Sequence, residues 1–285
     1  MSLFANWNGK IVREEEVAIS PNNRSFRYGD GCFETIKVIN GNIPLHQLHF
    51  DRLFSSLDTL CFTIPSFLTT SYLIDQITAL VLANGHSSFA RVRLVLYRGD
   101  GGLYDVEDHS PNFIIQSWAG NTETNRFNQQ GLVVDFFSDA IKTADRFSYI
   151  KSNNFLGYIM AALRAKQNKL DDAILLNAHN SLADATIANV FIVSAGIIKT
   201  PSISQGCVSG VMRKYLLNCF KKEGLPFYEV EIFPDELLNA SEVFLTNSIY
   251  GIRWVQKVQN SNYSNSTSSR LYQKFVAPLF QTSTI

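Results

Sequence analysis

The first 120 residues alternate between strand-like and helix-like patterns. An Asn8-Gly9 pair predicts the two-residue turn of a β-hairpin. Two segments have the length and apolar content of strands, at 32–39 and 89–98. Between them, apolar residues recur at helical spacing over 48–60 and 69–84. We therefore expect this part of the chain to contain both strands and helices.

A polar stretch separates these elements from a second set. Residues 120–130 have almost no apolar side chains and are predicted to be a linker between domains at 1–119 and 131–285. A helix is predicted to start just after Gly210, where its first amides would be exposed as hydrogen-bond donors. The remaining predicted elements are a strand from residue 132, a buried strand at 172–177, a strand-turn-strand at 242–255, and a polar loop at 259–269 before a terminal helix.

A lysine precedes a helical pattern near the middle of the chain. Lys151 follows two apolar residues, and apolar residues then recur at helical spacing from Phe155 to Leu163. Ser152 or one of the two asparagines after it is the predicted N-cap. Partial desolvation lowers the pKa of a lysine, and a Schiff base requires a neutral amine. The competing interpretation is an ordinary surface lysine before a core helix, and spacing alone favours it.

Composition and charge narrow the classes of function. The chain has 285 residues, 46% of them hydrophobic, which favours two domains. Its 25 basic and 25 acidic residues balance, so nothing indicates a nucleic-acid or membrane partner. The 4 cysteines lack CxxC spacing, which indicates neither a metal site nor a disulfide framework. With no leader pattern and no apolar stretch of membrane-spanning length, a cytoplasmic protein is expected.

Several segments, in order along the chain, resemble the class IV aminotransferases. They are YGDGCFET at 28–35, HFDRL at 49–53, KSNNFL at 151–156, LADATIANVF at 182–191, TPSISQGCVSGVMR at 200–213 and FLTNSIYGIRWV at 244–255. These enzymes use pyridoxal 5′-phosphate and include branched-chain and D-amino-acid aminotransferases and aminodeoxychorismate lyase. The resemblance implies an α+β fold with a small α/β N-terminal domain and a larger C-terminal pseudo-barrel domain. It also implies a homodimer.

The resemblance implies a role for each matching cofactor residue. Lys151 is expected to hold the cofactor as a Schiff base and to act as general base. Arg52 is expected to bind the phosphate through its planar guanidinium. Asp184 stands where the family has a glutamate that pairs with the pyridine nitrogen. Aspartate is one methylene shorter, so this contact could need a backbone shift or a bridging water. The other expected cofactor residues are Gly210, Val211, Met212, Thr246 and Asn247.

Substrate residues are implied by the same resemblance. Phe26 and Tyr28 are expected near the cofactor side of the small domain, and Ser248 in a turn that meets the phosphate or the substrate carboxylate. Arg93 and Arg98 are candidates for the substrate carboxylate. The alternation of the 89–98 strand predicts that its arginines do not all share one face.

The function implied is transfer of an amino group between an amino acid, possibly branched-chain, and a 2-oxo acid. The alternative is an aminodeoxychorismate lyase that forms 4-aminobenzoate and pyruvate, because both reactions use the same early steps. A third hypothesis is a cofactor-binding protein without turnover, suggested by Asp184 and by Phe155, where many relatives carry a tyrosine. The preferred substrate and its handedness are not readable from the sequence.

Overall fold

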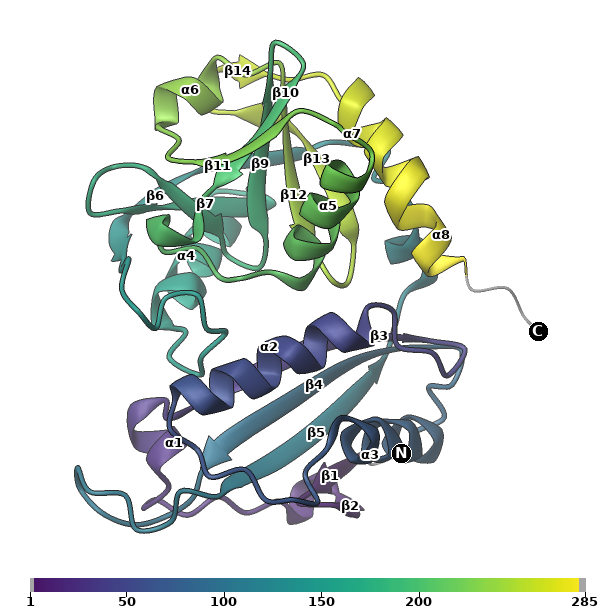
Figure 1. Cartoon of the computed structure of the whole chain (residues 1–285), viewed down its shortest axis with the longest axis vertical. Helices are drawn as coiled ribbons and strands as arrows, with labels where there is room; N and C mark the ends of the chain where they lie inside the picture. The colour runs from purple at the N-terminus through teal and green to yellow at the C-terminus, as the bar shows by residue number, and fades with distance from the viewer. Residues whose placement is uncertain (1–2, 282–285) are drawn as a thin grey trace. The chain divides into compact units, whose positions relative to one another are not determined.

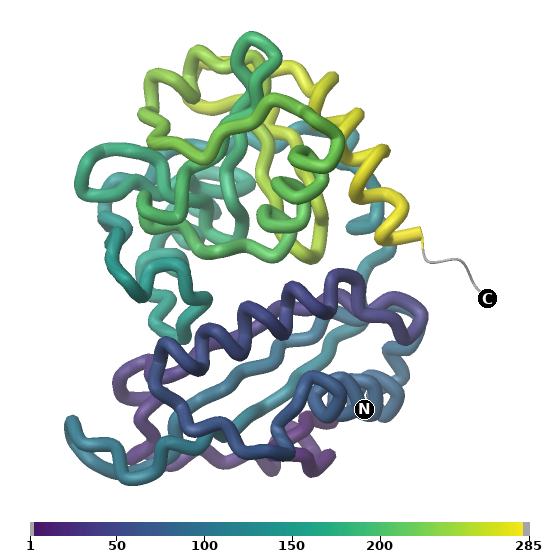
Figure 2. Tube along the Cα trace, viewed as in Figure 1, coloured from purple at the N-terminus to yellow at the C-terminus, as the bar shows by residue number. Residues whose placement is uncertain are grey.

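The computed structural model describes residues 3–281, which form two compact units. Unit 1 contains 3–122 together with 151–154, and unit 2 contains 123–150 and 155–281. Figure 1 labels the helices and strands, and Figure 2 follows the backbone through both units. Lys151 therefore groups with unit 1, whereas the sequence placed it early in the second domain. None of the helices formed by residues 3–281 combines the length and the apolar character needed to cross a membrane.

Unit 1 is built on an antiparallel sheet with strand order β2-β1-β5-β4-β3. The predicted hairpin is present, with Asn8 and Gly9 in left-handed conformations at φ 50° and 86°. The strands are β1 Phe4–Trp7, β2 Lys10–Arg13, β3 Gly31–Ile39, β4 Phe89–Arg98 and β5 Pro111–Ala119. The helices are η1 Glu14–Glu16, α1 Arg24–Tyr28, α2 His46–Thr59 and α3 Thr70–Ala83. The strand and helix predictions for this region are confirmed, although the Asn40-Gly41 turn after β3 leads into α2 and not into a paired strand.

The two faces of this sheet differ in character. Helices α2 and α3 pack against one face, which carries Ile36, Leu94 and Ile115, all fully buried. The opposite face carries the other half of each strand, because side chains alternate along a strand. There, cross-strand partners place Thr35, Arg93 and Gln116 in one row and Lys37 beside Arg91 in the next. One face is thus a conventional core and the other is rich in cations.

A buried ion cluster joins α2 to β3. The carboxylate of Glu34 accepts hydrogen bonds from Arg52 Nε (2.7 Å) and Nη2 (2.6 Å), and His49 Nδ1 lies 2.7 Å from Glu34 Oε2. Burial alone would raise the pKa of Glu34, but the charges of Arg52 and His49 hold it at about 2. The cluster fixes the guanidinium of Arg52 against the sheet.

Unit 2 is built on a curled sheet with strand order β11-β10-β9-β12-β13-β6-β7-β8, and β14 pairs with β13. β8 stands at one end of this order yet lies against β9 and β10 near the other end, so the sheet nearly closes on itself. The strands are β6 Leu132–Lys142, β7 Asp172–Asn177, β8 Leu182–Ala185, β9 Asn189–Ser194, β10 Ile197–Pro201, β11 Phe227–Val230, β12 Glu242–Asn247, β13 Gly251–Val258 and β14 Ser261–Asn262. The predicted strands at 132, 172–177 and 242–255 are confirmed.

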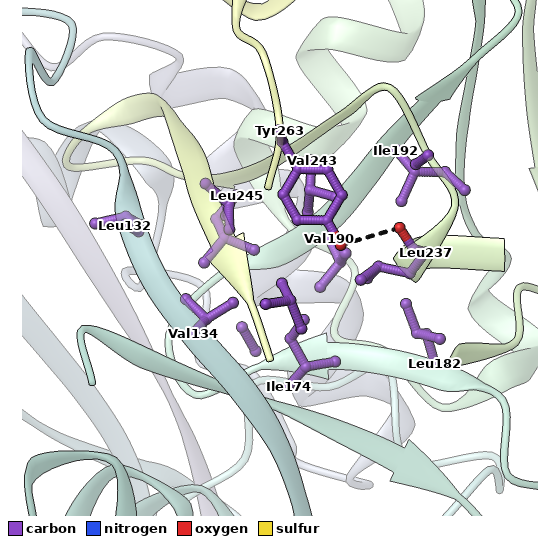
Figure 3. Close-up of a cluster of buried hydrophobic side chains, with 14 of the residues drawn as sticks. Leu132, Val134, Ile174, Leu182, Val190, Ile192, Leu237, Val243, Leu245 and Tyr263 are labelled. Carbon is purple, nitrogen blue, oxygen red and sulfur yellow. Dashed lines mark hydrogen bonds between the residues drawn. The ribbon is translucent and has the colours of Figure 1, made fainter. Parts of the chain in front are cut away.

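The inside of the curled sheet is the apolar core of unit 2. Figure 3 shows side chains from several strands converging there, among them Val134, Ile174, Val190 and Val243, each fully buried. Tyr263 closes the cluster and donates its hydroxyl to the carbonyl of Leu237 at 3.2 Å. These strands are covered on both sides, which explains their continuous apolar runs.

Several helical segments belong to unit 2. They are η2 Thr122–Asn125, α4 Leu156–Gln167, η3 Ile203–Gln205, α5 Val211–Lys222, α6 Pro234–Leu238, α7 Ser266–Leu271, the π-helical segment Tyr272–Val276 and α8 Ala277–Phe280. Of these, α4, α5 and α7 pack against the sheet of this unit. α7 begins inside the stretch predicted to be a polar loop. The predicted linker is held to unit 2, since Tyr272 donates to the carbonyl of Asn125 at 2.5 Å and Trp254 Nε1 to that of Asn128 at 2.9 Å.

Helix α4 departs from its sequence prediction in two ways. Its N-cap is Phe155, whose side chain makes no capping bond, so neither Ser152 nor an asparagine caps it. Its buried face is formed by Tyr158, Ala161 and Ala165. The larger apolar residues face solvent in the single chain: Leu156 is 69% exposed, Ile159 52%, Met160 48% and Leu163 48%.

The Glu34 cluster predicts how stability depends on pH. Because the pKa of Glu34 is about 2 in the folded chain against an ordinary 4.5, its stabilising contribution is complete above pH 4.5 and is lost as the pH falls towards 2. Denaturant unfolding between pH 6 and 2.5 should show this loss in the wild type. Glu34→Gln should be less stable at neutral pH by about 3 kcal/mol, because the largely buried guanidinium of Arg52 loses its carboxylate, and should show a weaker decline in acid.

The exposed ion pair of Glu123 and Arg126 supplies a control for this experiment. Glu123→Gln should keep both the neutral stability and the acid dependence of the wild type. An identical acid dependence in Glu34→Gln and the wild type would contradict the assignment.

Candidate functional site

The backbone of Lys151 is held by β3. Phe33 N donates to the carbonyl of Lys151, and Asn153 N donates to the carbonyl of Gly31, both at 2.9 Å. Ser152, between them, forms a bridge with Cys32. The Nζ of Lys151 lies 4.5 Å from the centroid of the Phe33 ring. The lysine segment is thus attached to β3, at the edge of the unit 1 sheet, by an isolated β-bridge, with the lysine amine over an aromatic ring.

The glycines of the GDG motif permit this approach. A Cβ on Gly31 would lie 2.3 Å from the carbonyl oxygen of Leu96 and 2.6 Å from Nδ2 of Asn153. Gly29 has φ 69°, and a Cβ there would lie 3.0 Å from the backbone nitrogen of Asn154. Glycine at these two positions therefore lets the lysine segment lie close to β3.

Arg93 lies on the same face of the sheet as Phe33. Its guanidinium carbon is 3.8 Å from the centroid of that ring. Burial and the neighbouring Arg91 lower the pKa of Arg93. In the next row, burial lowers the pKa of Lys37 to about 7. An array of cations in a partly desolvated setting favours an anionic ligand such as a carboxylate.

Arg98 lies on the opposite face, as the alternation predicted. Its Nε donates to both oxygens of Asp30 at 3.2 and 3.0 Å, and its Nη2 donates to the carbonyl of Leu60 at 2.6 Å. Its guanidinium carbon is 4.0 Å from the centroid of the Phe62 ring, and Nη1 is buried without a partner among residues 3–281. These bonds give Arg98 a structural role, because they anchor the GDG turn.

The remaining expected residues of unit 1 lie on two helices. Phe26 and Tyr28 are on α1 and are exposed, with Arg24 placed 5.4 Å from the centroid of the Tyr28 ring. Arg52 is on α2 and has two of its nitrogens bound to Glu34. These bonds to Glu34 fix the orientation of the Arg52 guanidinium.

Asp184 is a buried carboxylate on β8, only 2% exposed. The hydroxyl of Tyr158 donates to both of its oxygens, at 3.0 Å to Oδ1 and 2.8 Å to Oδ2. Val208 N also donates to Oδ2, at 2.9 Å. Sequence reasoning missed Tyr158, because a tyrosine at this position of α4 reads as one more apolar residue of a helix.

The loop before α5 is held by the same set of residues. Asp184 accepts from Val208 N, and Asn189 Nδ2 donates to the carbonyl of Val208 at 2.8 Å. Ser209 N donates to the carbonyl of Tyr149, two residues before Lys151, at 3.0 Å. The side chains of Asp184 and Asn189 thus bind the amide and the carbonyl of Val208. The bond from Ser209 connects this loop to the segment just before Lys151.

The start of α5 is shaped to receive an anion. Gly210 is its N-cap and no side chain caps the helix, so the amides of the first turn, including Val211 and Met212, lack a side-chain partner there. A Cβ on Gly210 would lie 1.9 Å from Oδ1 of Asn189, so glycine is required for this close packing.

The turn after β12 adds a second polar feature. Thr246 stands opposite Asn189 in the β12–β9 pairing, and its Oγ1 is buried without a hydrogen-bond partner among the described residues. Asn247 is committed to the turn itself, since its Oδ1 accepts from Ile249 N at 3.0 Å and Tyr250 N at 2.9 Å. Ser248 follows in that turn and is half-buried.

These residues fit a phosphorylated pyridine. An uncapped helix start suits the phosphate, an unpartnered buried hydroxyl at Thr246 suits a polar ligand atom, and the buried carboxylate of Asp184 suits a protonated ring nitrogen. None of the described residues forms a cluster of histidine, cysteine and acidic side chains that could hold a metal ion.

Comparison with known proteins agrees with this geometry. Residues 31–258 match the family Amino-transferase class IV. The chain is 28% identical over 281 residues to a candidate branched-chain-amino-acid aminotransferase of Methanocaldococcus jannaschii, covering 94% of this chain and 93% of that one. It is also 28% identical over 232 residues to an aminodeoxychorismate lyase of Vibrio harveyi, covering 81% of this chain and 83% of that one.

A solved structure shows the same fold. The branched-chain aminotransferase of Thermoproteus uzoniensis, determined with norvaline, superposes with a TM-score of 0.87 at 24% identity, covering 98% of this chain and 95% of that one. This confirms the expected α+β fold with a curled sheet in the larger unit. The family match extends from the GDG turn to the end of β13. The chain therefore belongs to the class IV aminotransferases, a family of pyridoxal-phosphate enzymes.

Proposed function

We propose that this protein transfers an amino group between an amino acid and a 2-oxo acid, with Lys151 as the residue that carries pyridoxal phosphate. The observation that supports this most strongly is the way Lys151 is held. Hydrogen bonds to β3 fix its backbone, and the loop before α5 holds Tyr149 just upstream. An ordinary surface lysine needs no such support, whereas an amine that must both bond to a cofactor and move a proton does.

Each of the other residues has a task in the proposed reaction. Pyridoxal phosphate supplies a ring that accepts the electron pair left when the substrate loses its Cα proton. The amine of Lys151 takes that proton and later returns it. Asp184 keeps the pyridine nitrogen protonated. The amides of Val211 and Met212, at the N-terminus of α5, bind the phosphate together with Arg52, and Gly210 permits their approach.

Substrate binding is assigned to the cationic face of unit 1. Arg93 lies over Phe33 with Lys151 and is proposed to bind a substrate carboxylate. Phe26, Tyr28 and Ser248 are proposed as further substrate contacts, and Thr246 and Asn247 as cofactor contacts. Of these, Thr246 has the firmest support, because its buried hydroxyl needs a partner.

The second candidate function is aminodeoxychorismate lyase. The match to the Vibrio harveyi lyase supports it, as do Gly29 to Phe33 and Gly210 to Arg213, which resemble the lyases. The aminotransferase is favoured slightly, on Phe33-Glu34-Thr35 and Leu245-Thr246-Asn247. Lys151 and Asp184 serve both reactions and do not choose between them.

A homodimer is proposed from the exposed apolar face of α4. Four large side chains there, Leu156, Ile159, Met160 and Leu163, are 48–69% exposed in the single chain. A contiguous exposed patch of this kind marks a contact surface. A cytoplasmic location is also proposed, since all four cysteines are free thiols, as expected in a reducing compartment.

Lys151→Ala tests the proposed function. The purified wild type, supplied with pyridoxal phosphate, should show a visible absorption band that the variant lacks. Amino transfer should fall by a factor of at least about a thousand, because both bond formation and proton transfer are lost. Lys166→Ala, an exposed lysine on α4, is the control and should retain both properties. Transfer that survives in Lys151→Ala would refute the assignment.

Arg93 and Arg98 should respond differently to the same substitution. Arg93→Gln should lower kcat/KM by about ten- to a hundred-fold, the value of a lost charge-assisted hydrogen bond, with little change in melting temperature. Arg98→Gln should chiefly lower the melting temperature, because Asp30 and the Leu60 carbonyl lose their hydrogen bonds from Arg98. Steady-state kinetics and thermal unfolding of both variants distinguish these roles. A kinetic loss in Arg98→Gln together with a stability loss in Arg93→Gln would contradict the assignment.

Ile159→Glu tests the dimer. A charge in the middle of the exposed face of α4 should convert the protein to a monomer in sedimentation at micromolar concentration, because burying it would cost several kcal/mol. Leu82→Glu, at a leucine of α3 that is 62% exposed, is the matched control and should leave assembly unchanged. A monomeric wild type, or an Ile159→Glu dimer, would disprove this interface.

A further inference from the structure

The hydroxyl of Tyr158 occupies an unusual place in front of the Asp184 carboxylate. It lies 3.0 Å from Oδ1 and 2.8 Å from Oδ2, nearly equidistant from the two. An atom so placed lies close to the plane that bisects the carboxylate, along the direction in which the side chain points. Adding one methylene at position 184 would push the oxygens towards this hydroxyl.

We propose that Tyr158 is a positioning residue for Asp184, and that the phenol and the short carboxylate together fill the space that a longer carboxylate would take. The inference rests on the proposed role of Asp184 at the pyridine nitrogen. It accounts for the aspartate at this position, because the phenol hydroxyl occupies the space directly in front of the carboxylate.

The phenol is itself firmly held. Its ring stacks on Phe155 with centroids 4.3 Å apart and planes 26° apart, and Lys142 Nζ lies 4.9 Å from its centroid. Tyr158 is 6% exposed on the inner face of α4. Burial, followed by the charge of Asp184, raises the pKa of Tyr158 above its ordinary range. Tyr158 therefore remains protonated and can only donate to Asp184, which must be the acceptor.

This arrangement has a chemical consequence. With Tyr158 and Val208 N both donating, the carboxylate is held in one orientation. A second titratable group near this set is Cys207, a buried thiol whose pKa burial raises to about 12, so it stays neutral. Removing the phenol should leave the carboxylate free to rotate and less able to hold a proton on the ring nitrogen.

Tyr158→Phe tests the proposal, since it keeps the ring and its stacking on Phe155. The dissociation constant for pyridoxal phosphate added to the apo protein should rise about ten-fold, and kcat of the holoenzyme should fall about ten-fold with KM little changed. Tyr263→Phe is the matched control, because it also removes a buried phenol hydroxyl, bonded to the Leu237 carbonyl in the same unit. It should leave cofactor affinity and kcat as in the wild type.

A second pair of variants keeps the test decisive if Tyr158→Phe folds poorly. Asp184→Glu should lose more than about ten-fold in cofactor affinity, because its oxygens meet the phenol, and Asp184→Glu/Tyr158→Phe should recover at least part of that loss. Losses that simply add in the double variant, or Tyr158→Phe behaving as the wild type, would overturn the proposal.

Asp184→Asn separates this inference from the function on which it rests. Full turnover in Asp184→Asn would show that the carboxylate is not the partner of the ring nitrogen. The proposed role of Asp184 and the proposed role of Tyr158 would then both be wrong. Impaired turnover in Asp184→Asn combined with wild-type behaviour in Tyr158→Phe would remove the role of Tyr158 alone.

Discussion

The backbone pairing of the lysine segment with β3 is the constraint on which the rest of the account depends. Two hydrogen bonds, from Phe33 to Lys151 and from Asn153 to Gly31, attach four residues of the second half of the sequence to the sheet of unit 1. Without them Lys151 would lie in a free connection between β6 and α4. With them its amine stands over Phe33, in the partly desolvated setting that a nucleophilic lysine requires.

In unit 2 as well, hydrogen bonds fix a buried group and the loop beside it. Asp184, Asn189 and the Val208 backbone form one hydrogen-bonded set, so the carboxylate assigned to the ring nitrogen also fixes the loop that leads into α5. The loop before α5 and the Asp184 carboxylate are therefore positioned by shared hydrogen bonds. A change at one of these side chains should disturb both functions, which is typical of sites held by a connected second layer of residues.

The sequence predicted the elements well and the side-chain environments less well. Strands such as 172–177 and the helix after Gly210 follow from apolar runs and glycine placement, which are local signals. Helix α4 was located correctly, yet its apolar stripe faces outwards, because alanines and Tyr158 form its inner face. Helical spacing identifies an amphipathic face and cannot say which surface covers it.

The candidate site also shows this difference between sequence motifs, which the sequence reveals, and side-chain contacts, which it does not. Motif order singled out Lys151 and Asp184 as cofactor residues and Arg98 as a substrate residue, but it gave no sign of the bonds that join Arg98 to Asp30. Tyr158 had no sequence signal at all, because its contact with Asp184 joins residues 26 apart on different elements. Contacts of that kind depend on how α4 lies across the curled sheet, and only the tertiary structure supplies them.

A single-turnover spectrum of the purified holoenzyme tests the central claim most directly. The protein would be mixed with a panel of L- and D-amino acids and then, separately, with aminodeoxychorismate. We expect one class of amino acid to remove the visible band of the bound cofactor and to release one equivalent of 2-oxo acid. An unchanged band with every amino acid, together with accumulation of 4-aminobenzoate, would contradict the aminotransferase and establish the lyase.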